Sequence, residues 1–340
     1  MIGRIYRLMG TKRIEMKWRE IPITTDTVLV RPEYLAICAA DQRYYLGQRK
    51  KEVLREKLPM ALIHEATGTI IRDFSGKYKS GTKVVLIPLK ETDEINNKVK
   101  GNYRENSEFA SSGVDGFMRD IVTIESGRII PIEDGYSIIH VFTEVLSVAI
   151  GAINIFESVR QTSINSIGVW GDGSIGFITA LALRCKYPQS KIYVFGKSVR
   201  KLSKFSFVTQ KYYIDDIPYN LTIDHAFECV GGRNSEDAIK QIMNRITPQG
   251  IINLLGVSES SVGIDTRQVL DKGLKLVGSS RSDKSDFEEA VALIQGNEIC
   301  RKYIGLLTSD SIDIKTENDI TRWFEQDTLN DFKTVGRWLI

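Results

Sequence analysis

The stretch Ile167-Gly168-Val169-Trp170-Gly171-Asp172-Gly173-Ser174-Ile175-Gly176 decides the fold. Its first four residues are mostly apolar and have strand character. The glycines then form a G-x-G-x-x-G pattern, and the apolar residues that follow recur at helical spacing. A strand, a glycine turn and a helix in this order are typical of a dinucleotide-binding unit.

Each glycine of the pattern has a physical task. Gly171 permits the tight turn, Gly173 lets a pyrophosphate approach the backbone, and Gly176 lets the helix pack closely on the strand. The first helical turn, which contains Ser174 and Ile175, offers free N–H groups and the positive end of its dipole to the phosphates. The alternative is a strand-to-helix turn that binds no ligand, but the strands that follow also fit a nucleotide-binding sheet.

Strand and helix patterns alternate from residue 166 to about residue 278. Strands are expected at 167–170, 191–196, 212–214, 225–232, 250–257 and 275–278. This rhythm predicts an α/β domain, a doubly wound parallel sheet over residues 146–280.

Residues 1–145 lack this rhythm and contain short strand patterns between turns. Strands are expected at 27–32, 67–71, 82–88 and 116–122, and a helix at 142–156. The first strand should end before Pro32. The polar stretch from about 90 to 115 predicts a long exposed loop. These patterns indicate a separate, mainly antiparallel β domain, to which we assign residues 281–340 as well.

Length, net charge and cysteine content limit the classes of protein to which this chain can belong. The chain has 340 residues, which suggests about two domains, and its net charge of +3 is too small to imply nucleic acid or membrane binding. The four cysteines are scattered, which fits a reducing cytoplasm. The N-terminal residues contain no signal-peptide apolar region, and the longest apolar run, 145–156, is too short to span a bilayer. A cytoplasmic protein is therefore expected.

The strand at 191–196 bears on the choice of cofactor. An acid usually follows this strand in NAD-binding units because a carboxylate accepts the ribose 2′-OH. Here the sequence is Phe195-Gly196-Lys197-Ser198, followed by Lys201. A small residue followed by cations suits the 2′-phosphate of NADP, so Lys197, Ser198 and Lys201 are predicted to bind it. The alternative is that these cations begin a solvated helix.

Four residues could bind a metal: Cys38, His64, Glu65 and Glu144. Catalytic zinc takes thiolate, imidazole and carboxylate ligands and keeps an exchangeable position. Each residue also has a simpler interpretation: Cys38 as a small buried side chain, His64 as a core histidine, and Glu144 as an exposed helix residue. Spacing alone does not decide between these interpretations.

The motifs around these residues resemble those of the zinc-dependent medium-chain dehydrogenases, the alcohol and sorbitol dehydrogenase superfamily. The stretch 64–68, HEATG, resembles the zinc signature, with Ile63 in place of the usual glycine. The stretch 38–41, CAAD, resembles C-G-S/T-D, with Ala40 in place of the residue that relays a proton. The stretch 144–148, EVLSV, resembles E-P-L-S-V of the polyol branch. The resemblance covers essentially the whole chain.

This resemblance implies a GroES-like catalytic domain over 1–145 and 281–340, and a Rossmann domain over 146–280. It also implies one catalytic zinc held by Cys38, His64, Glu65 and Glu144, with Glu144 either as a ligand or behind the ligands. The cysteine-rich lobe that holds a structural zinc in many relatives has no cysteines here. We therefore expect one zinc rather than two.

A narrower set of motifs resembles the ribulose-5-phosphate reductase branch of this family. It comprises residues 37–45, 62–65, 111–118, 170–173 and 193–197. The resemblance implies NADPH-dependent reduction of D-ribulose 5-phosphate to D-ribitol 5-phosphate, for CDP-ribitol and cell-wall teichoic acid or capsule synthesis. A sugar phosphate needs cations, and Arg43 and Arg49 are candidates because guanidinium matches phosphate; surface charge is the alternative.

Other functions remain open at this point. The first is an NADP-linked zinc polyol dehydrogenase that acts on an unphosphorylated sugar alcohol. The second is a zinc-free quinone or enoyl reductase of the same superfamily, which the retained Cys38, His64 and Glu65 argue against. The third is a binding protein with this fold and no turnover. A homodimer is expected, as is an association with a ribitol-5-phosphate cytidylyltransferase.

Overall fold

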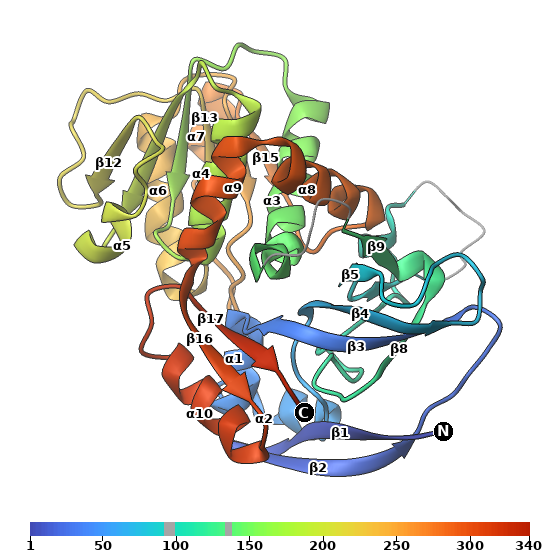
Figure 1. The fold of residues 1–340 in the computed structure, drawn as a ribbon. Helices are drawn as coiled ribbons and strands as arrows, with labels where there is room; N and C mark the ends of the chain where they lie inside the picture. The colour runs from blue at the N-terminus through green and yellow to red at the C-terminus, as the bar shows by residue number, and fades with distance from the viewer. Residues whose placement is uncertain (92–98, 133–137) are drawn as a thin grey trace. The chain divides into compact units, whose positions relative to one another are not determined.

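The computed structural model describes residues 1–91, 99–132 and 138–340. The chain forms two compact units, shown in Figure 1. The first unit consists of Met1–Glu144, Ser282–Gln295 and Thr308–Ile340. The second unit consists of Val145–Arg281 and Gly296–Leu307.

The second unit is built on a six-stranded sheet whose strands are all parallel. The strands run in the order β12-β11-β10-β13-β14-β15, so the sheet grows in both directions from β10. This order is doubly wound, and it confirms the doubly wound parallel sheet predicted from the sequence. The strands are β10 (Ser166–Trp170), β11 (Lys191–Gly196), β12 (Gln210–Tyr213), β13 (His225–Glu228), β14 (Ile251–Leu254) and β15 (Lys275–Gly278).

Six α-helices of the described residues belong largely to this unit, and two of them, the helices that follow β10 and β13, pack buried apolar residues against the sheet. The six are α3 (Thr143–Val159), α4 (Ser174–Lys186), α5 (Val199–Ser203), α6 (Ser235–Arg245), α7 (Thr266–Lys272) and α9 (Glu298–Ile304). Trp170 and Phe195 stack at 3.8 Å between ring centroids and belong to a core that includes Ile239 and Ile242 of α6. Helix α9 contacts α4 and lies in the second unit, although the sequence analysis assigns all of 281–340 to the catalytic domain.

One helical stretch of the described residues, Ile138–Val159, is long and apolar enough to cross a membrane by length and composition. It is longer than the apolar run predicted from the sequence. Within its most apolar window, 72% is buried inside the fold. The core helix of a soluble protein passes the same test, and this burial favours that interpretation.

The first unit is built on a seven-stranded sheet in the order β16-β17-β3-β4-β5-β9, with β8 paired to β3. All of its pairs are antiparallel except β16 with β17. The strands are β3 (Thr27–Ala36), β4 (Glu65–Asp73), β5 (Lys83–Leu86), β8 (Val122–Glu125), β9 (Ile129–Pro131), β16 (Thr308–Ile314) and β17 (Lys333–Trp338). Two further pairs join β1 (Ile2–Gly10) with β2 (Arg13–Glu20), and β6 (Leu89–Lys90) with β7 (Glu108–Phe109).

Strand β3 corrects one sequence-based boundary. The strand was expected to end before Pro32, yet it continues to Ala36 with a shift of register between Pro32 and Tyr34. Pro32 lacks the N–H of a regular ladder, and the irregularity at this position lets the strand continue past it. The continuation matters because it brings Ala36 opposite Glu65.

The remaining helices of the first unit are α1 (Ala39–Tyr45), α2 (Lys51–Lys57), α8 (Lys284–Gly296) and α10 (Glu317–Asp327). Phe287 and Val291 of α8 share a core with Val85, Ile130 and Phe109. The predicted loop at 90–115 includes residues 92–98, which lie outside the described residues. Its described part is more structured than predicted, with a short helix at Gly101–Tyr103 and strand β7.

Candidate metal centre and cofactor site

Cys38 lies directly before helix α1. Its backbone is extended (φ −90°, ψ 154°), and its N–H donates to Oδ2 of Asp41, in the first turn of the helix, at 3.1 Å. A side-chain acceptor from the first turn fixes where the chain enters the helix. The backbone that carries the half-buried thiol of Cys38 is therefore fixed in position after the end of β3.

Glu65 begins strand β4 and is fully buried. Its Oε1 accepts a hydrogen bond of 2.5 Å from Nζ of Lys333, which also donates to the carbonyl of Ile37 at 3.0 Å. No described residue donates a hydrogen bond to the buried Oε2 of Glu65. A buried carboxylate oxygen costs free energy unless a donor or a cation satisfies it. Oε2 is therefore an available ligand atom.

The carboxylate of Asp41 lies beside the His64 ring and interacts with several groups. Its Oδ1 lies 3.5 Å from Nδ1 of His64 and accepts from Ser111 Oγ at 2.5 Å and from the N–H of Ile63 at 3.2 Å. Burial opposes charge on His64, but Asp41 and Cys38 outweigh it and hold the pKa of His64 well above its ordinary value. An imidazole that presents Nδ1 to a carboxylate can offer Nε2 to a metal.

Ile63, which replaces a family glycine, keeps a backbone conformation that favours glycine. Its φ is +74°, and its side chain is fully buried. A β-branched residue rarely adopts this left-handed region, and doing so costs about 1–3 kcal/mol. The carbonyl of Ile63 accepts the N–H of Phe117 at 2.8 Å, and a Cβ on Gly116 would lie 2.3 Å from that oxygen. These contacts hold the strained peptide that carries His64.

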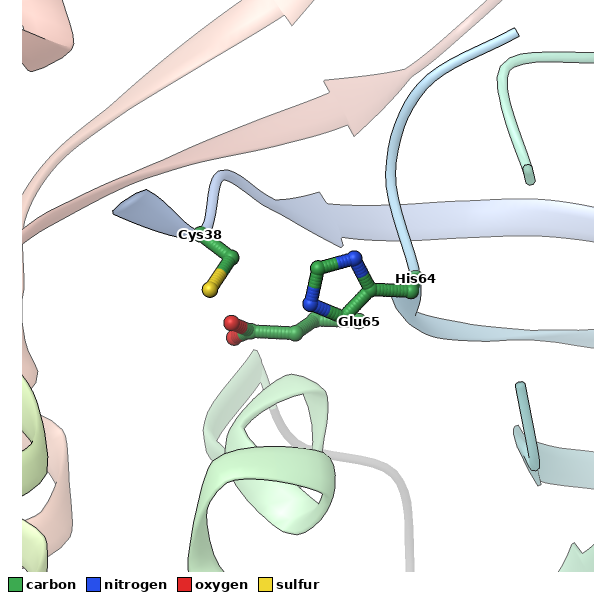
Figure 2. A group of neighbouring side chains, drawn as sticks. All are labelled: Cys38, His64 and Glu65. Carbon is green, nitrogen blue, oxygen red and sulfur yellow. The ribbon is translucent and has the colours of Figure 1, made fainter. Parts of the chain in front are cut away.

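Cys38, His64 and Glu65 come together in the folded chain, as Figure 2 shows. One ligand atom from each, sulfur, nitrogen and carboxylate oxygen, lies within 4.8 Å of the others. This set is the kind that catalytic zinc prefers, and the available Oε2 of Glu65 fits a cation at this point. The residues present therefore fit a metal ion.

Glu144, the fourth predicted ligand, is the second residue of α3 and is 6% exposed. Burial raises the pKa of its carboxyl to about 7, against the opposing charge of His64 and with a further rise from Glu65. These charge interactions indicate that Glu144 lies near His64 and Glu65. Its own oxygens are not among the ligand atoms that gather within 4.8 Å.

The predicted phosphate ligands follow Cys38 in the chain. Arg43 lies in the last turn of α1, and the guanidinium of Arg49 lies 4.9 Å from the centroid of the Tyr44 ring. Both side chains are half-buried. Their role toward a substrate phosphate stays a prediction.

In the second unit, the glycine turn between β10 and α4 has the predicted local structure. Gly171 has a φ of +122°, and Gly173 precedes the first turn of α4, in which Ser174 and Ile175 lie. A Cβ on Gly176 would lie 2.0 Å from the carbonyl oxygen of Gly171, so the close approach of helix and turn requires glycine here. A Cβ on Gly173 would meet open space, which leaves room for a ligand beside the backbone.

The turn after β11 contains the predicted NADP-binding residues. Ser198 precedes α5, and its side chain accepts from the N–H of Lys201 at 3.3 Å. The N–H groups of Lys197 and Ser198 donate to Oδ2 of Asp172 at 2.8 and 2.7 Å. No acid directly follows Gly196 in the sequence, so no carboxylate was expected at this turn, but Asp172 supplies one from the glycine turn.

A pocket of about 620 Å³ lies at the carboxyl ends of β10, β11 and β13. Parallel sheets of this order bind nucleotides at that edge. Gly171, Gly173 and Lys197 line the pocket, whereas Ser174, Ile175, Gly176, Ser198 and Lys201 are not among the lining residues. Lining residues that were not predicted from the sequence include Asp172, Ile214, Asp215, Val230, Asn234 and Gln241.

Comparison with known protein families identifies both parts of the chain. Residues 24–134 match the alcohol dehydrogenase GroES-like domain, and residues 138–335 match the glucose dehydrogenase C-terminus. The chain belongs to the medium-chain dehydrogenase family. This result confirms the predicted family and the fold class, a GroES-like unit with a Rossmann unit.

Within this family, the chain is similar to several named reductases over its whole length. It is 47% identical to ribulose-5-phosphate reductase 1 of Staphylococcus aureus, and 43% identical to ribulose-5-phosphate reductase of Bacillus spizizenii. Each alignment covers 100% of both chains. The chain is thus an oxidoreductase of the medium-chain dehydrogenase family.

Solved structures extend the comparison. The chain is 44% identical to Staphylococcus aureus TarJ in a crystal structure in complex with NADPH, with a TM-score of 0.88 and full coverage of both chains. It also shares its fold with L-idonate 5-dehydrogenase from Escherichia coli, at 20% identity, a TM-score of 0.85 and coverage of 99% and 98%.

Three residues at the candidate centre of this medium-chain dehydrogenase escaped the sequence analysis as site residues. They are Asp41 beside His64, Ser111 beside Asp41, and Lys333 beside Glu65. Asp41 was visible as part of a family motif, but neither spacing nor periodicity connects Lys333 with a residue 268 positions earlier.

Proposed function

We propose that this protein reduces D-ribulose 5-phosphate to D-ribitol 5-phosphate with NADPH. The observation that carries the proposal is full-length identity of 43–47% to three proteins named ribulose-5-phosphate reductases. The candidate site supports it, because the chain retains a thiol, an imidazole and a carboxylate in one buried group. In the cell, the product D-ribitol 5-phosphate would be used to make CDP-ribitol for teichoic acid or capsule synthesis.

Cys38, His64 and Glu65 would hold a zinc ion, with Glu144 as a fourth ligand or as a carboxylate behind the ligands. When bound, the metal supplies Lewis-acid polarisation of the substrate carbonyl. The protein supplies the orientation: Asp41 faces the His64 ring, and Lys333 binds one oxygen of Glu65 and leaves the other available. Arg43 and Arg49 are our candidates for binding the substrate phosphate. Ala40 has no hydroxyl to relay a proton, so another group must protonate the product.

The pocket of the second unit would hold NADPH. The 44% identity to TarJ, which binds NADPH in its crystal structure, supports this cofactor. Lys197, with Ser198 and Lys201 behind it, would face the 2′-phosphate, and Gly171, Gly173, Ser174, Ile175 and Gly176 would approach the pyrophosphate. In this proposal, the second unit binds the cofactor and the first unit carries the chemistry. Lys197→Ala should therefore weaken NADPH binding more than NADH binding.

We also propose a cytoplasmic homodimer that associates with a ribitol-5-phosphate cytidylyltransferase. Enzymes of this class consume the product, so association would pass it directly to the next reaction. Size-exclusion chromatography with light scattering, with and without the cytidylyltransferase, tests both assemblies.

NADPH oxidation assays test the proposed reaction. The purified protein is given D-ribulose 5-phosphate or unphosphorylated ribulose, with and without prior treatment with a chelator. The proposal expects oxidation with the phosphorylated sugar only, loss of the rate after chelation, and recovery with added zinc. Equal rates with free ribulose would favour the alternative, an NADP-linked zinc polyol dehydrogenase. A full rate after complete removal of metal would favour a zinc-free reductase.

A further inference from the structure

Asp172 lies in the glycine turn, yet its side chain reaches the end of the next strand, β11. Its Oδ2 accepts the N–H groups of Lys197 and Ser198 at 2.8 and 2.7 Å. Asp172 and Lys197 both line the pocket of the second unit. The carboxylate is thus bound to the very turn that is expected to meet the adenosine ribose.

The side chain of Asp172 also occupies the space of the residue at position 196. A Cβ on Gly196 would lie 2.6 Å from Cβ of Asp172 and 2.7 Å from its Oδ2. Real Cβ atoms do not approach so closely, so position 196 accepts no side chain while Asp172 stays in place. This position ends the second strand of the unit, where NAD-binding units carry their acid.

We propose that Asp172 sets the choice between NADPH and NADH by supplying, from the glycine turn, the carboxylate that position 196 lacks. This inference rests on the proposed cofactor site. A carboxylate at the ribose accepts the 2′-OH of NADH, as the acid after the second strand does in other units. The same charge repels a 2′-phosphate and lowers the preference for NADPH.

Lys197 opposes this effect. Its exposed side chain follows the strand directly and offers a cation to the 2′-phosphate. Asp172 therefore acts in favour of NADH and Lys197 in favour of NADPH. The protein should bind both cofactors, with a preference that the two charges set between them.

Asp172→Asn is the decisive variant because it keeps the geometry and removes the charge. An amide oxygen can accept the N–H groups of Lys197 and Ser198 as the carboxylate does. Asp215→Asn is the matched control: Asp215 is an exposed carboxylate that lines the same pocket from the turn after β12. Lys197→Ala is the second, independent variant.

Calorimetric titration of the full chain with NADPH and with NADH gives the ratio of their dissociation constants. Wild type should bind both. Asp172→Asn should raise the preference for NADPH by about tenfold, and Lys197→Ala should lower it by a similar factor. Asp215→Asn should change the ratio by less than about threefold. Titration with 2′,5′-ADP and 5′-AMP should repeat the pattern, because these fragments carry the ribose with and without its 2′-phosphate.

Three results would overturn the inference: no NADH binding by wild type, an unchanged or lowered ratio in Asp172→Asn, or an equal rise in Asp215→Asn. A double variant guards against an unexpected defect in folding. Asp172→Gly together with Gly196→Asp moves the acid to its usual position, and should restore the NADH binding that Asp172→Gly alone loses. These titrations need no sugar substrate, so failure of D-ribulose 5-phosphate reduction would leave them interpretable.

Discussion

Replacement of Lys333 by methionine should destabilise the first unit strongly, and zinc should reverse a large part of the loss. Lys333 and Glu65 form an ion pair whose side chains are only 5% and 0% exposed. Removing one partner leaves a buried charge and costs about 3–5 kcal/mol. A metal at Oε2 of Glu65 would neutralise that charge. The remaining cost, about 2 kcal/mol, is that of an Ile37 carbonyl without its donor.

Urea unfolding, followed by tryptophan fluorescence, measures this difference. Trp18, Trp323 and Trp338 lie in the first unit, and only Trp170 lies in the second, so the signal reports mainly on the unit of interest. Wild type and variant are compared after chelation and after reloading with zinc. Equal losses in the two states would refute the idea that a metal binds against Glu65.

Two controls make the comparison sharper. Lys83→Met breaks an ion pair with Glu33 at 2.6 Å, but those side chains are 36% and 27% exposed, so the cost should stay below about 1 kcal/mol in both states. Burial raises the pKa of Glu65 above its ordinary 4.5 even though Lys333 lowers it, and loss of that cation in metal-free Lys333→Met should raise the pKa further, so the folded state holds the proton more tightly than the unfolded state. The loss should therefore be smaller at pH 4, where the Ile37 carbonyl still lacks its donor, and grow as the pH rises above about 4.5.

Three further predictions concern the two sites. Cys38→Ser and His64→Ala should lose most of the metal and nearly all activity, whereas Glu144→Gln should keep zinc and lower turnover. Zinc analysis and rate measurements on each variant check this. If Glu144→Gln matched the wild-type protein in zinc content and rate, Glu144 would not serve the metal. Elemental analysis should give about one zinc per chain, and two tightly held ions would contradict the single-site proposal. Gly176→Ala should weaken NADPH binding at least tenfold in a titration, because its Cβ would lie 2.0 Å from the carbonyl oxygen of Gly171; wild-type affinity would show that the turn adapts.

Local patterns in the sequence predicted much of the fold. The strands of the parallel sheet were predictable because buried parallel strands are continuous apolar runs, and Gly171 and Gly176 mark the turn that opens α4. Local rules failed where a neighbouring strand decided the outcome. Pro32 should have ended β3, but pairing with β4 continues beyond it through an irregular register.

The candidate centre was less accessible to sequence reasoning. Family motifs identify Cys38, His64 and Glu65, yet no local pattern indicates that their ligand atoms converge. Lys333 and Asp172 were missed for one reason: each acts on a segment far away in the chain, 268 residues distant for Lys333 and 25 for Asp172. Ile63 differs from these residues. The sequence showed that it replaces a glycine of the family motif, but not that it keeps a glycine-like φ of +74°.

The discontinuity of the first unit has a consequence for biosynthesis. Strand β17 lies between β16 and β3, so a late segment of the chain joins the edge strand β16 to a sheet whose other strands come from residues 27–131. During translation, Glu65 is made long before Lys333, and the whole of the second unit is synthesised in between. The nascent chain must hold Glu65 without its cation for that interval. A nonsense mutation just before Lys333 would leave all four proposed metal ligands and the nucleotide pocket encoded. It would nevertheless remove β17, the strand that pairs with both β16 and β3.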